Sequence, residues 1–437
     1  MSEQQPVGDD KMEPIALAYT DIGRVKDANE DSFLVDKRLR LYVVADGMGG
    51  HAAGEVASET AVNEIRRYVQ EREEVINDYV RTGEGREDIL ELLEQAVRHA
   101  GRAIFRLAQE DPAKRGMGTT VSLLLLTPMR GFIAHVGDSR VYLVRDGDVF
   151  QLTEDHSLIN ELIKRGKLRP EDAATAPYKN AVTRAVGVYA DVEVDTLEFE
   201  IAQGDDFLLC SDGLTGHLRD DKEIAEILKG NDFVAVPKTF VEVANQRGGK
   251  DNITSVVVHL GAAEAGHEVA FKVNTLRNMP LFQHLSYVEL TEVLNIAELQ
   301  KVSAGQVLFR EGEPGDALFL VLEGRIRIEK NGVELALLGP GGHFGEMALM
   351  DKTSRSADAL AAQDARVMAI GRRPLFNLMR KDKEIAVKLL WCFVQVLNLR
   401  LRNTSADLSQ ARIDNVELQD MLGLEAEDDE DGGVEPA

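Results

Sequence analysis

The sequence of 437 residues predicts an α+β protein made of two β-rich parts. Apolar, strand-like runs joined by turn dipeptides fill the first part, two amphipathic helical stretches interrupt them, and a second, glycine-dense β block begins near Leu281. Strands joined by hairpins and covered by long helices are typical of a mostly antiparallel fold. The length also corresponds to two or three domains.

The strand-like runs of the first part begin at Ile15 and end at Leu260. Asp146-Gly147 separates VYLV from VFQL and predicts a two-residue hairpin turn. One helical stretch follows Gly54 and another covers residues 88–109, because apolar residues recur there three and four positions apart. The other strand-like runs are SFLVD, LYVVADG, VSLLLLT, GFIAHV, DFLLCSDG and ITSVVVHL.

The small, polar segment GAAEAGHE follows Leu260 and predicts a linker. In the second block, Asn331-Gly332 marks a hairpin and residues 374–404 form a helical run, while the acidic end EAEDDEDGGVEPA is predicted to be disordered. The expected organisation is a flexible tail over 1–14, a first domain over 15–260, a linker over 261–280, a second domain over 281–402, and a helical extension with an acidic tail over 403–437.

Charge and cysteine content narrow the function classes. The formal net charge is −25, from 50 Lys and Arg against 75 Asp and Glu, so this surface would repel a nucleic acid or an anionic membrane. The two cysteines, Cys210 and Cys392, are far apart, which excludes a disulfide framework and a Cys-rich zinc site. The N-terminus has no apolar signal segment and no apolar run approaches the roughly 18 residues of a membrane span, so we expect a cytoplasmic protein.

Aspartates recur beside turns at the ends of apolar strands. Asp46 follows LYVVA, Asp212 follows DFLLCS, and Asp251 precedes ITSVVVH. Carboxylates on several strand ends can converge at one rim of a sheet, and such a cluster stays ionised only when cations neutralise it. Hard divalent ions take all-oxygen sites, so the pattern predicts at least two Mg²⁺ or Mn²⁺ ions. The alternative for any single Asp-Gly pair is ordinary turn chemistry, which is our interpretation of Asp146-Gly147.

Residues 15–260 resemble the metal-dependent serine/threonine protein phosphatases of the PPM or 2C type, in their bacterial form. The resemblance implies an antiparallel β-sandwich flanked by helices, with metal ions at one rim, and a mobile flap over the polar stretch 157–180 that borders the substrate groove. The matching text, in the order of the family, is VKDANEDSF (25–33), VVADGMGGHAAGE (43–55), GMGTT (116–120), VGDSRVYL (136–143), LTEDHS (152–157), VTRAVG (182–187), LLCSDGL (208–214) and GGKDNITSVVV (248–258).

The resemblance also implies the roles of individual residues. Asp46 would bridge two metal ions, the carbonyl of Gly47 would complete the second site, and Asp138 would hold a weaker third ion. A water activated by two or three Mn²⁺ or Mg²⁺ ions would then attack phosphorus in line, without a phosphoenzyme. The remaining implied residues are Asp212 and Asp251 at the first metal, and Glu30 and Asp31 at the water that it binds.

Two departures from the family pattern concern catalytic residues. The family usually has a phosphate-binding arginine where this chain has Lys26, which cannot form a bidentate fork. Arg24, two residues away, is the alternative cation. Many eukaryotic members have a histidine acid directly after the Asp-Gly pair, where Met48 stands here. His51 is the candidate acid, with helix capping as its alternative role.

Residues 281–402 resemble the cyclic-nucleotide-binding domains of catabolite-activator-type regulators and kinase regulatory subunits. GEPGDALFLVLEGRIRI (312–328) matches the β-roll of that family, and HFGEMALMDKTSRSADALA (343–361) matches its phosphate-binding cassette, with Ser354 in place of a common proline. The resemblance implies that Glu346 accepts a hydrogen bond from the ribose and Arg355 pairs with the cyclic phosphate of cAMP or cGMP. Gly345, Met347, Ala348 and Ser356 complete the implied nucleotide site. The alternative is an interaction module without nucleotide.

The last helical run has apolar residues at coiled-coil-like spacing. Its three interpretations are a dimer helix, giving a homodimer, a lid over the nucleotide, or packing against the β-roll, and Thr404 interrupts the seam. The apolar positions are Leu390, Val394, Leu397, Leu401 and Leu408, broadened by Trp391 and Phe393.

The leading hypothesis is a cytoplasmic phosphatase for phosphoserine and phosphothreonine proteins that counteracts a kinase and is regulated by a cyclic nucleotide. A signalling pseudophosphatase that binds phosphoproteins is the first alternative, motivated by Lys26, although Asp46, Asp212 and Asp251 argue against it. A transcription factor is the second alternative. No helix-turn-helix pattern follows residue 402 and the tail is acidic, so we expect no nucleic-acid partner.

Overall fold

The computed structural model describes residues 14–49, 53–176, 178, 181–261, 272–273, 275–346 and 354–422. Residues 1–13 of the expected tail and 423–437 of the expected acidic end lie outside this set, as does most of the expected linker. The chain forms two compact units: residues 1–275 with 286–298, and residues 276–285 with 299–437. Residues 286–298, expected from the sequence to belong to the second domain, therefore pack with the first unit.

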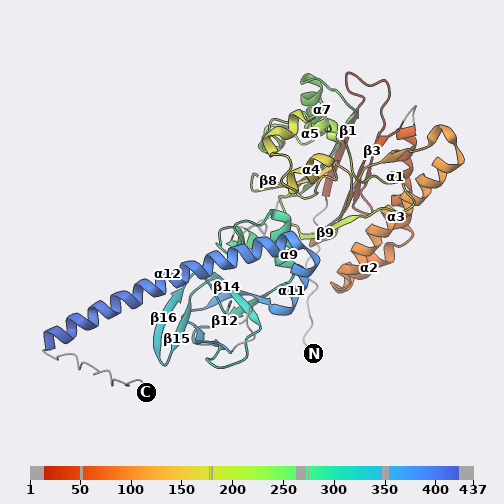
Figure 1. Ribbon diagram of the computed structural model, residues 1–437. Helices are drawn as coiled ribbons and strands as arrows, with labels where there is room; N and C mark the ends of the chain where they lie inside the picture. The colour runs from red at the N-terminus through yellow and green to blue at the C-terminus, as the bar shows by residue number, and fades with distance from the viewer. Residues whose placement is uncertain are drawn as a thin grey trace, which may run out of the picture. The chain divides into compact units, whose positions relative to one another are not determined.

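The first unit contains two antiparallel sheets (Figure 1), as predicted. One has the order β1-β11-β10-β7-β8, and the other has the order β2-β3-β5-β6-β9 with β4 paired to β3. The strands of the first sheet are β1 (Pro14–Asp21), β11 (Ile253–Leu260), β10 (Asp206–Cys210), β7 (Arg140–Arg145) and β8 (Asp148–Gln151). The strands of the second are β2 (Asp31–Asp36), β3 (Leu41–Met48), β4 (Gly118–Thr119), β5 (Val121–Leu126), β6 (Arg130–Val136) and β9 (Asp195–Glu200).

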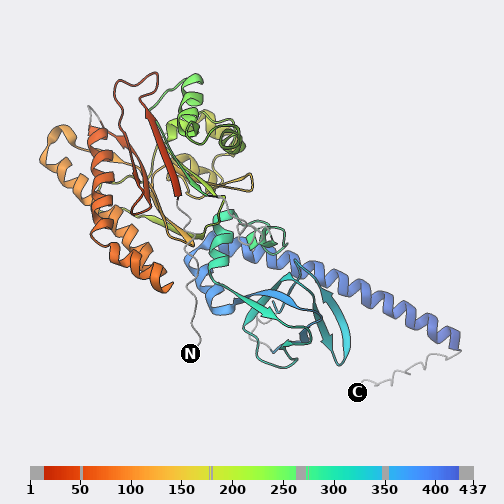
Figure 2. The ribbon, with the colours of Figure 1, turned by 180° about the vertical axis from the view of Figure 1, so that it is seen from behind.

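Strand alternation assigns each face of the sheets to a different core. On β3, Tyr42 and Val44 pack against side chains of the first sheet, while Val43 and Ala45 pack against helices. The sheets therefore form a sandwich, with α1 and α3 outside one sheet and α6 and α7 outside the other (Figure 2). The helices of this unit are α1 (Ala53–Gln70), α2 (Glu73–Thr82), α3 (Arg86–Glu110), α4 (Leu158–Lys164), α5 (Asp212–Thr215), α6 (Lys222–Gly230), α7 (Val236–Gln246) and α9 (Tyr287–Asn295).

The two predicted hairpins are confirmed. Asp146 and Gly147 have φ angles of 53° and 88° between β7 and β8. Asn331 and Gly332 have φ angles of 52° and 75° between β15 (Ile326–Lys330) and β16 (Val333–Leu338) in the second unit. Consecutive left-handed residues form the turn that matches the twist of a hairpin, and Asn, Asp and Gly tolerate that conformation best.

The second unit is built on two four-stranded sheets, as expected for a β-roll. Phe319, Phe344 and Val367 belong to its apolar core. The predicted helical run over 374–404 is divided at Asp382, whose side chain accepts hydrogen bonds from the N–H groups of Glu384 (2.8 Å) and Ile385 (3.0 Å) and so begins a new helix. The elements are β12 (Ala297–Val302), β13 (Val307–Phe309), β14 (Ala317–Glu323), β15 (Ile326–Lys330), β16 (Val333–Leu338), β17 (His343–Phe344), β18 (Asp358–Ala361), β19 (Ala365–Gly371), α11 (Arg372–Lys381) and α12 (Lys383–Leu422).

Within the described ranges, every helix is too short or too polar to cross a lipid bilayer.

Candidate active site at one rim of the sandwich

The predicted carboxylates come together at one rim of the sandwich, which we call the acidic rim: Asp31, Asp46, Asp138, Asp212 and Asp251. Asp31 and Asp46 are direct cross-strand partners at the end of β2 and β3. Asp212 follows β10 and Asp251 precedes β11, and these two strands are neighbours in the other sheet. Burial, followed by the charges of the other four aspartates, raises the pKa of Asp46 well above its ordinary value. Five carboxylates from both sheets therefore converge at this rim.

The acidic rim carries more negative charge than it can keep ionised by itself. Burial is the main cause that raises the pKa of Asp31 and of Asp138 to about 7, and the charge of Asp212 adds to both shifts. Burial also raises the pKa of Asp212, with the charge of Asp251 as the next cause. Carboxyl groups with such shifts take up protons unless a cation replaces them.

The donor set fits divalent metal ions. Asp31 is 8% exposed, and its Oδ2 accepts hydrogen bonds from the hydroxyls of Ser211 and Thr254, both at 2.7 Å. Its Oδ1 is buried without a hydrogen-bond partner among the residues that the structure describes. In the same ranges, no three His, Cys, Asp or Glu side chains are already arranged around one point as ligands of an ion. All-oxygen carboxylate sets nevertheless suit Mg²⁺ and Mn²⁺.

Two glycines allow the loops of the acidic rim to approach each other. A Cβ atom on Gly47 would lie 2.1 Å from the carbonyl oxygen of Gly54. A Cβ atom on Gly213 would lie 2.0 Å from the carbonyl oxygen of Asn252. Each contact is shorter than van der Waals packing permits, so glycine is required beside both Asp46 and Asp212. Glu30 lies next to Gly47 at the acidic rim, because the Glu30 carbonyl accepts a hydrogen bond from the N–H of Gly47 at 3.1 Å.

The candidate cations have different surroundings. The Lys26 ammonium forms an ion pair with Asp251 Oδ1. Partial burial alone would lower the pKa of Lys26, but the hydrogen bond and charge of Asp251 outweigh it and raise that pKa. Arg24 is exposed and its N–H donates to the carbonyl of Gly249 at 2.7 Å. His51 lies outside the described residues.

Hydroxyl side chains that support Asp46 were not identified from the sequence. Thr120 Oγ1 accepts from the N–H of Asp46 at 2.9 Å and lies 2.7 Å from Ser139 Oγ. Thr119 Oγ1 donates to the carbonyl of Asp46 at 2.9 Å. Both threonines are buried, and the only sequence signal for them was the match of GMGTT (116–120) to the family text.

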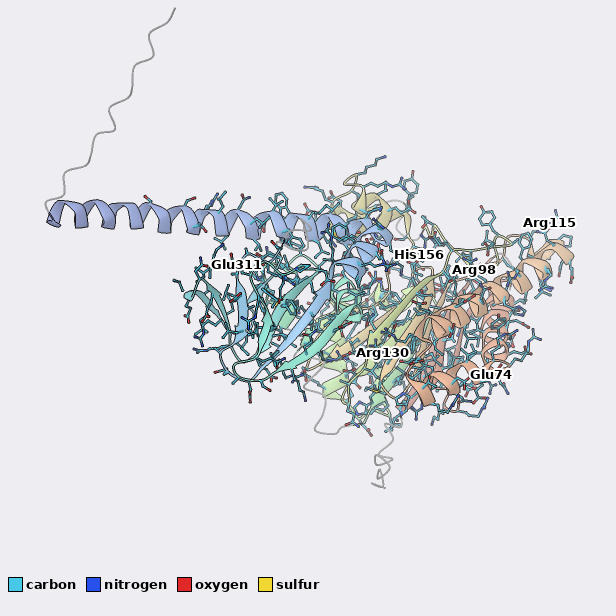
Figure 3. The ribbon with its side chains drawn as sticks, turned by 90° about the horizontal axis from the view of Figure 1, so that it is seen from below. Glu74, Arg98, Arg115, Arg130, His156 and Glu311 are labelled. Atoms are coloured by element: carbon cyan, nitrogen blue, oxygen red, sulfur yellow. The ribbon has the colours of Figure 1, made fainter. Side chains whose placement is uncertain are left out.

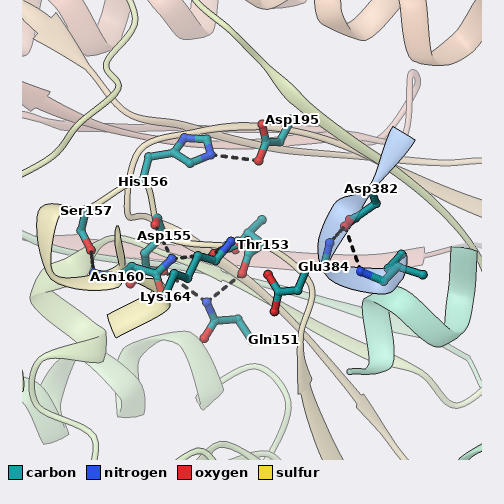
Figure 4. A network of polar contacts seen from close by, with 12 residues as sticks. Gln151, Thr153, Asp155, His156, Ser157, Asn160, Lys164, Asp195, Asp382 and Glu384 are labelled. Carbon is teal, nitrogen blue, oxygen red and sulfur yellow. Dashed lines mark hydrogen bonds and ion pairs between the residues drawn. The ribbon is translucent and has the colours of Figure 1, made fainter. Parts of the chain in front are cut away.

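His156 fixes the loop that carries Asp138, and Figure 4 shows this histidine beside Asp195. Its N–H donates to the carbonyl of Gly137 at 2.7 Å, and its Nδ1 accepts from the N–H of Gly137 at 3.1 Å. Its Nε2 lies 3.0 Å from Asp195 Oδ2. The flap starts at the next residue, and the N–H of Leu158 donates to the carbonyl of Ala181 at 2.8 Å, which joins the two ends of the flap. The base of the flap and the Asp138 loop are therefore one hydrogen-bonded unit.

The second unit contains a cavity of about 280 Å³ in the predicted nucleotide cassette. Arg355 is 6% exposed, its Nη1 donates to the carbonyl of Gly345 at 3.2 Å, and its guanidinium carbon lies 4.1 Å from the centre of the Phe309 ring. Burial lowers the pKa of Arg355, and its Nε has no hydrogen-bond partner in the described part of the chain. Met347 and Ala348 lie outside the described residues. The other residues that line the cavity include Ile328, Ala336, Leu338, His343, Phe344, Glu346, Ser354, Ser356 and Ala357.

Comparisons with known proteins agree with the division of the chain into two units. The sequence profile described as protein phosphatase 2C matches residues 23–255, and that described as cyclic nucleotide-binding domain matches residues 299–382. A serine/threonine phosphatase of Listeria innocua is 37% identical over 255 residues, which cover 57% of this chain and 98% of that protein. Protein phosphatase PhpP of Streptococcus pneumoniae is 38% identical over 251 residues, covering 56% of this chain and 97% of that protein.

Solved structures match the first unit. The serine/threonine phosphatase PstP/Ppp of Mycobacterium tuberculosis is 35% identical with a TM-score of 0.50, covering 57% of this chain and 99% of that one. A structure of the PstP catalytic domain in complex with 2 manganese ions is 34% identical with the same TM-score and coverage. The chain described here therefore belongs to the protein phosphatase 2C family: it is a metal-dependent protein serine/threonine phosphatase followed by a cyclic-nucleotide-binding domain.

Proposed function

We propose that this phosphatase acts on phosphoserine and phosphothreonine proteins made by a kinase, and that cAMP or cGMP bound to its second unit regulates the rate. The acidic rim, where buried carboxylates meet with raised pKa values, is the observation that carries the catalytic assignment. The buried Arg355 at the cavity supports the regulatory assignment. Two free, buried cysteines fit a reducing cytoplasm.

In this proposal, each residue of the acidic rim has its own role. Asp46, the carbonyl of Gly47, Asp212 and Asp251 would hold two ions, and Asp138 would hold a third. When bound, the ions neutralise phosphoryl charge and supply an activated water nucleophile. Glu30 and Asp31 would orient water, and the hydroxyls of Ser211 and Thr254 hold the Asp31 carboxyl in place for that task.

Substrate phosphate requires a cation next to the acidic rim. Lys26 is the first candidate because its ammonium already lies beside Asp251, and a metal ion that takes over Asp251 would release Lys26 towards an incoming phosphate. Arg24 is the second candidate, since it lies on the same loop and is exposed. His51 would donate the proton to the leaving oxygen.

The nucleotide would bind through one charged end and one apolar wall of the cavity. Arg355 and Ser356 would hold the cyclic phosphate together with the backbone of Gly345, Met347 and Ala348. Glu346, which is 3% exposed, would accept from the ribose hydroxyl. The Nε of Arg355 has no hydrogen-bond partner within the described ranges, so it is free to donate to the cyclic phosphate. Binding phosphate would also remove the energetic cost of a buried charged donor without an acceptor.

The catalytic proposal is tested with the full chain, Mn²⁺ and p-nitrophenyl phosphate. Asp212→Asn should lower kcat by at least about a hundredfold, because it removes one charge from the group that would hold metal. Asp232→Asn, at an exposed aspartate outside the acidic rim, is the control and should retain the wild-type rate. A wild-type chain that binds phosphopeptide without metal-dependent turnover would instead support the pseudophosphatase alternative.

The regulatory proposal is tested by calorimetry with cAMP and cGMP, followed by turnover with each nucleotide. Arg355→Ala should weaken binding at least tenfold, because a charge-assisted phosphate contact contributes more than about 1.4 kcal/mol. Arg310→Ala, at an exposed arginine of the same unit, should bind normally. No binding of either nucleotide to the wild-type chain would leave the β-roll as an interaction module.

We also propose that two copies of the chain pair through α12. Ile385, Leu389 and Val396 are buried on one side of this helix, but the opposite side is apolar as well and exposed. An apolar helix surface of this kind requires a second partner, and side chains seven positions apart match those of an identical parallel helix. Part of α12 extends beyond the β-roll in Figure 1. The exposed side chains, between 42% and 68% exposed, are Val387, Leu390, Trp391, Val394, Leu397 and Leu401.

Light scattering during gel filtration tests the pairing. Val394→Glu should convert a dimer to a monomer, because it places a charge in the centre of the apolar stripe. Leu335→Glu, at an equally exposed apolar residue on β16, is the control and should leave the mass unchanged. A wild-type mass of one chain at tens of micromolar concentration would refute the proposal.

A further inference from the structure

Helix α9 lies outside both matched family segments, 23–255 and 299–382, yet it packs with the phosphatase unit. The residues before it, 276–285, and after it, from 299 onward, belong to the nucleotide-binding unit. Its start is fixed by a capping box between Ser286 and Glu289. The chain of the regulatory unit therefore returns to the catalytic unit through one well-defined helix.

The first turn of α9 is bound to the edge of the five-stranded sheet. The ring of Tyr287 stacks on Phe150 of β8, with centroids 4.2 Å apart. Its hydroxyl accepts from Arg145 Nη1 at 2.9 Å. Arg145 in turn pairs with Asp205 at 2.6 Å, with side chains only 5% and 1% exposed. A hydrogen bond to a buried charge of this kind fixes the helix more firmly than apolar contact alone.

The last turn of α9 is bound to the edge of the six-stranded sheet. Asn295 Nδ2 donates to the carbonyl of Glu198 on β9 at 2.9 Å, and Asn295 Oδ1 accepts from Arg130 Nη1 at 3.0 Å. Arg130, labelled in Figure 3, also pairs with the Glu198 carboxylate at 2.5 Å. One short helix therefore holds β8 at one end and β9 at the other.

Both strands lead to the base of the flap. β9 begins at Asp195, whose carboxylate contacts His156 at 3.0 Å and Arg184 at 2.7 Å. β8 ends at Gln151, whose side chain donates to the carbonyl of Thr153 at 2.7 Å in the segment that leads to His156. Figure 4 shows the contact of Asp195 with His156 and that of Gln151 with Thr153. Because His156 forms two hydrogen bonds with Gly137, the series of contacts that starts at α9 ends at the residue before Asp138.

We propose that α9 is a positioning element of the phosphatase reaction: when docked, it fixes β8 and β9 and, through them, the flap base beside Asp138. Tyr287 and Asn295 are its positioning residues. Because both flanks of α9 belong to the nucleotide-binding unit, the helix is also the covalent route by which a bound nucleotide changes turnover. This second part rests on the proposed nucleotide regulation, whereas the first part does not.

The positioning role is tested in the full chain with the double variant Tyr287→Phe, Asn295→Ala, which removes hydrogen bonds at both ends of α9 and creates little cavity. Hydrogen exchange at residues 152–158 and 181–187 should become at least threefold faster. The Mn²⁺ concentration for half-maximal turnover should rise at least threefold. Tyr19→Phe, at a half-exposed tyrosine of β1, is the matched control and should change neither quantity. Faster exchange confined to 286–298, with an unchanged Mn²⁺ dependence, would overturn the proposal.

The route for the nucleotide is tested with the same double variant, and Asn295→Ala alone replaces it if the pair does not fold. Calorimetry should give wild-type nucleotide affinity, while the ratio of turnover with and without nucleotide should approach one. A variant that keeps the full wild-type ratio refutes the route. A wild-type chain that binds nucleotide with a ratio of one refutes the regulation and the route together, and the exchange experiment then decides the positioning role separately.

Discussion

The buried His135 should make the stability of the phosphatase unit depend on pH. Its ring is 1% exposed, Nε2 donates to the carbonyl of Glu154 at 3.0 Å, and Nδ1 lies 3.0 Å from Ser122 Oγ. Burial, together with the neighbouring ring of His156 at 4.9 Å, lowers the pKa of His135 from 6.5 to about 4. The perturbation is His135→Gln, which keeps a side-chain N–H for the carbonyl but cannot titrate.

The size of the effect follows from the two pKa values. The unfolded chain takes up a proton near the ordinary 6.5, whereas the folded chain keeps His135 neutral until about 4. The unfolded state therefore binds more protons in this range, and the free energy of unfolding falls as the pH falls. Integrating between about pH 7.5 and 5.5 gives a loss of about 1.3 kcal/mol from this group, with most of it below 6.5.

Urea unfolding in EDTA at about pH 7.5, 6.5 and 5.5 measures the contribution of His135 to the free energy of unfolding. The stability difference between wild type and His135→Gln should shrink by about 1.3 kcal/mol from the highest to the lowest pH. His284→Gln, at an exposed histidine of the other unit, is the control. A difference that stays constant across the three pH values would show that His135 is not held neutral, and the reasoning from burial would be refuted.

Three further predictions concern stability. Asp205→Asn should lower the free energy of unfolding by about 3–5 kcal/mol in urea, because Arg145 would stay buried without its counter-charge. Gly131→Ala should destabilise by about 1–3 kcal/mol, since its Cβ would lie 2.3 Å from the Phe199 ring; an unchanged thermal midpoint would contradict this packing. Asp382→Ala should cost about 1 kcal/mol in thermal unfolding of the second unit through loss of the helix cap, and an equal loss in Asp382→Asn would argue against capping.

The sequence predicted the sandwich and the acidic rim because both depend on local patterns. Strand alternation and the turn dipeptide at Asp146 define the hairpin, and Asp-Gly pairs at strand ends place Asp46 and Asp212 at one rim. Support by Thr120 was missed, since a buried threonine in an apolar strand is not distinguished by pattern from one that fills the core. The break at Asp382 was missed because apolar periodicity continues across it.

The docking of α9 could not be predicted for another reason. The capping box at Ser286 predicts where a helix begins but carries no information about its partner. The partners, Arg145 on β7 and Glu198 on β9, are more than ninety positions away in the chain, and two of the contacts involve ordinary charged surface residue types. Only contacts between residues far apart in the sequence show with which unit the helix packs.

The return of the chain into the catalytic unit has a consequence for dissecting this enzyme. A fragment ended at Leu260, the last residue of β11, would lack α9, although every strand of the sandwich would be present. The Phe150 ring would be uncovered, and Arg145 would lose its contact with the Tyr287 hydroxyl. Such a truncated catalytic domain would have about the length of the single-domain relatives, but the sheet edges that α9 covers in the full chain would be exposed to solvent. A fragment that keeps these edges covered must therefore extend to Glu298.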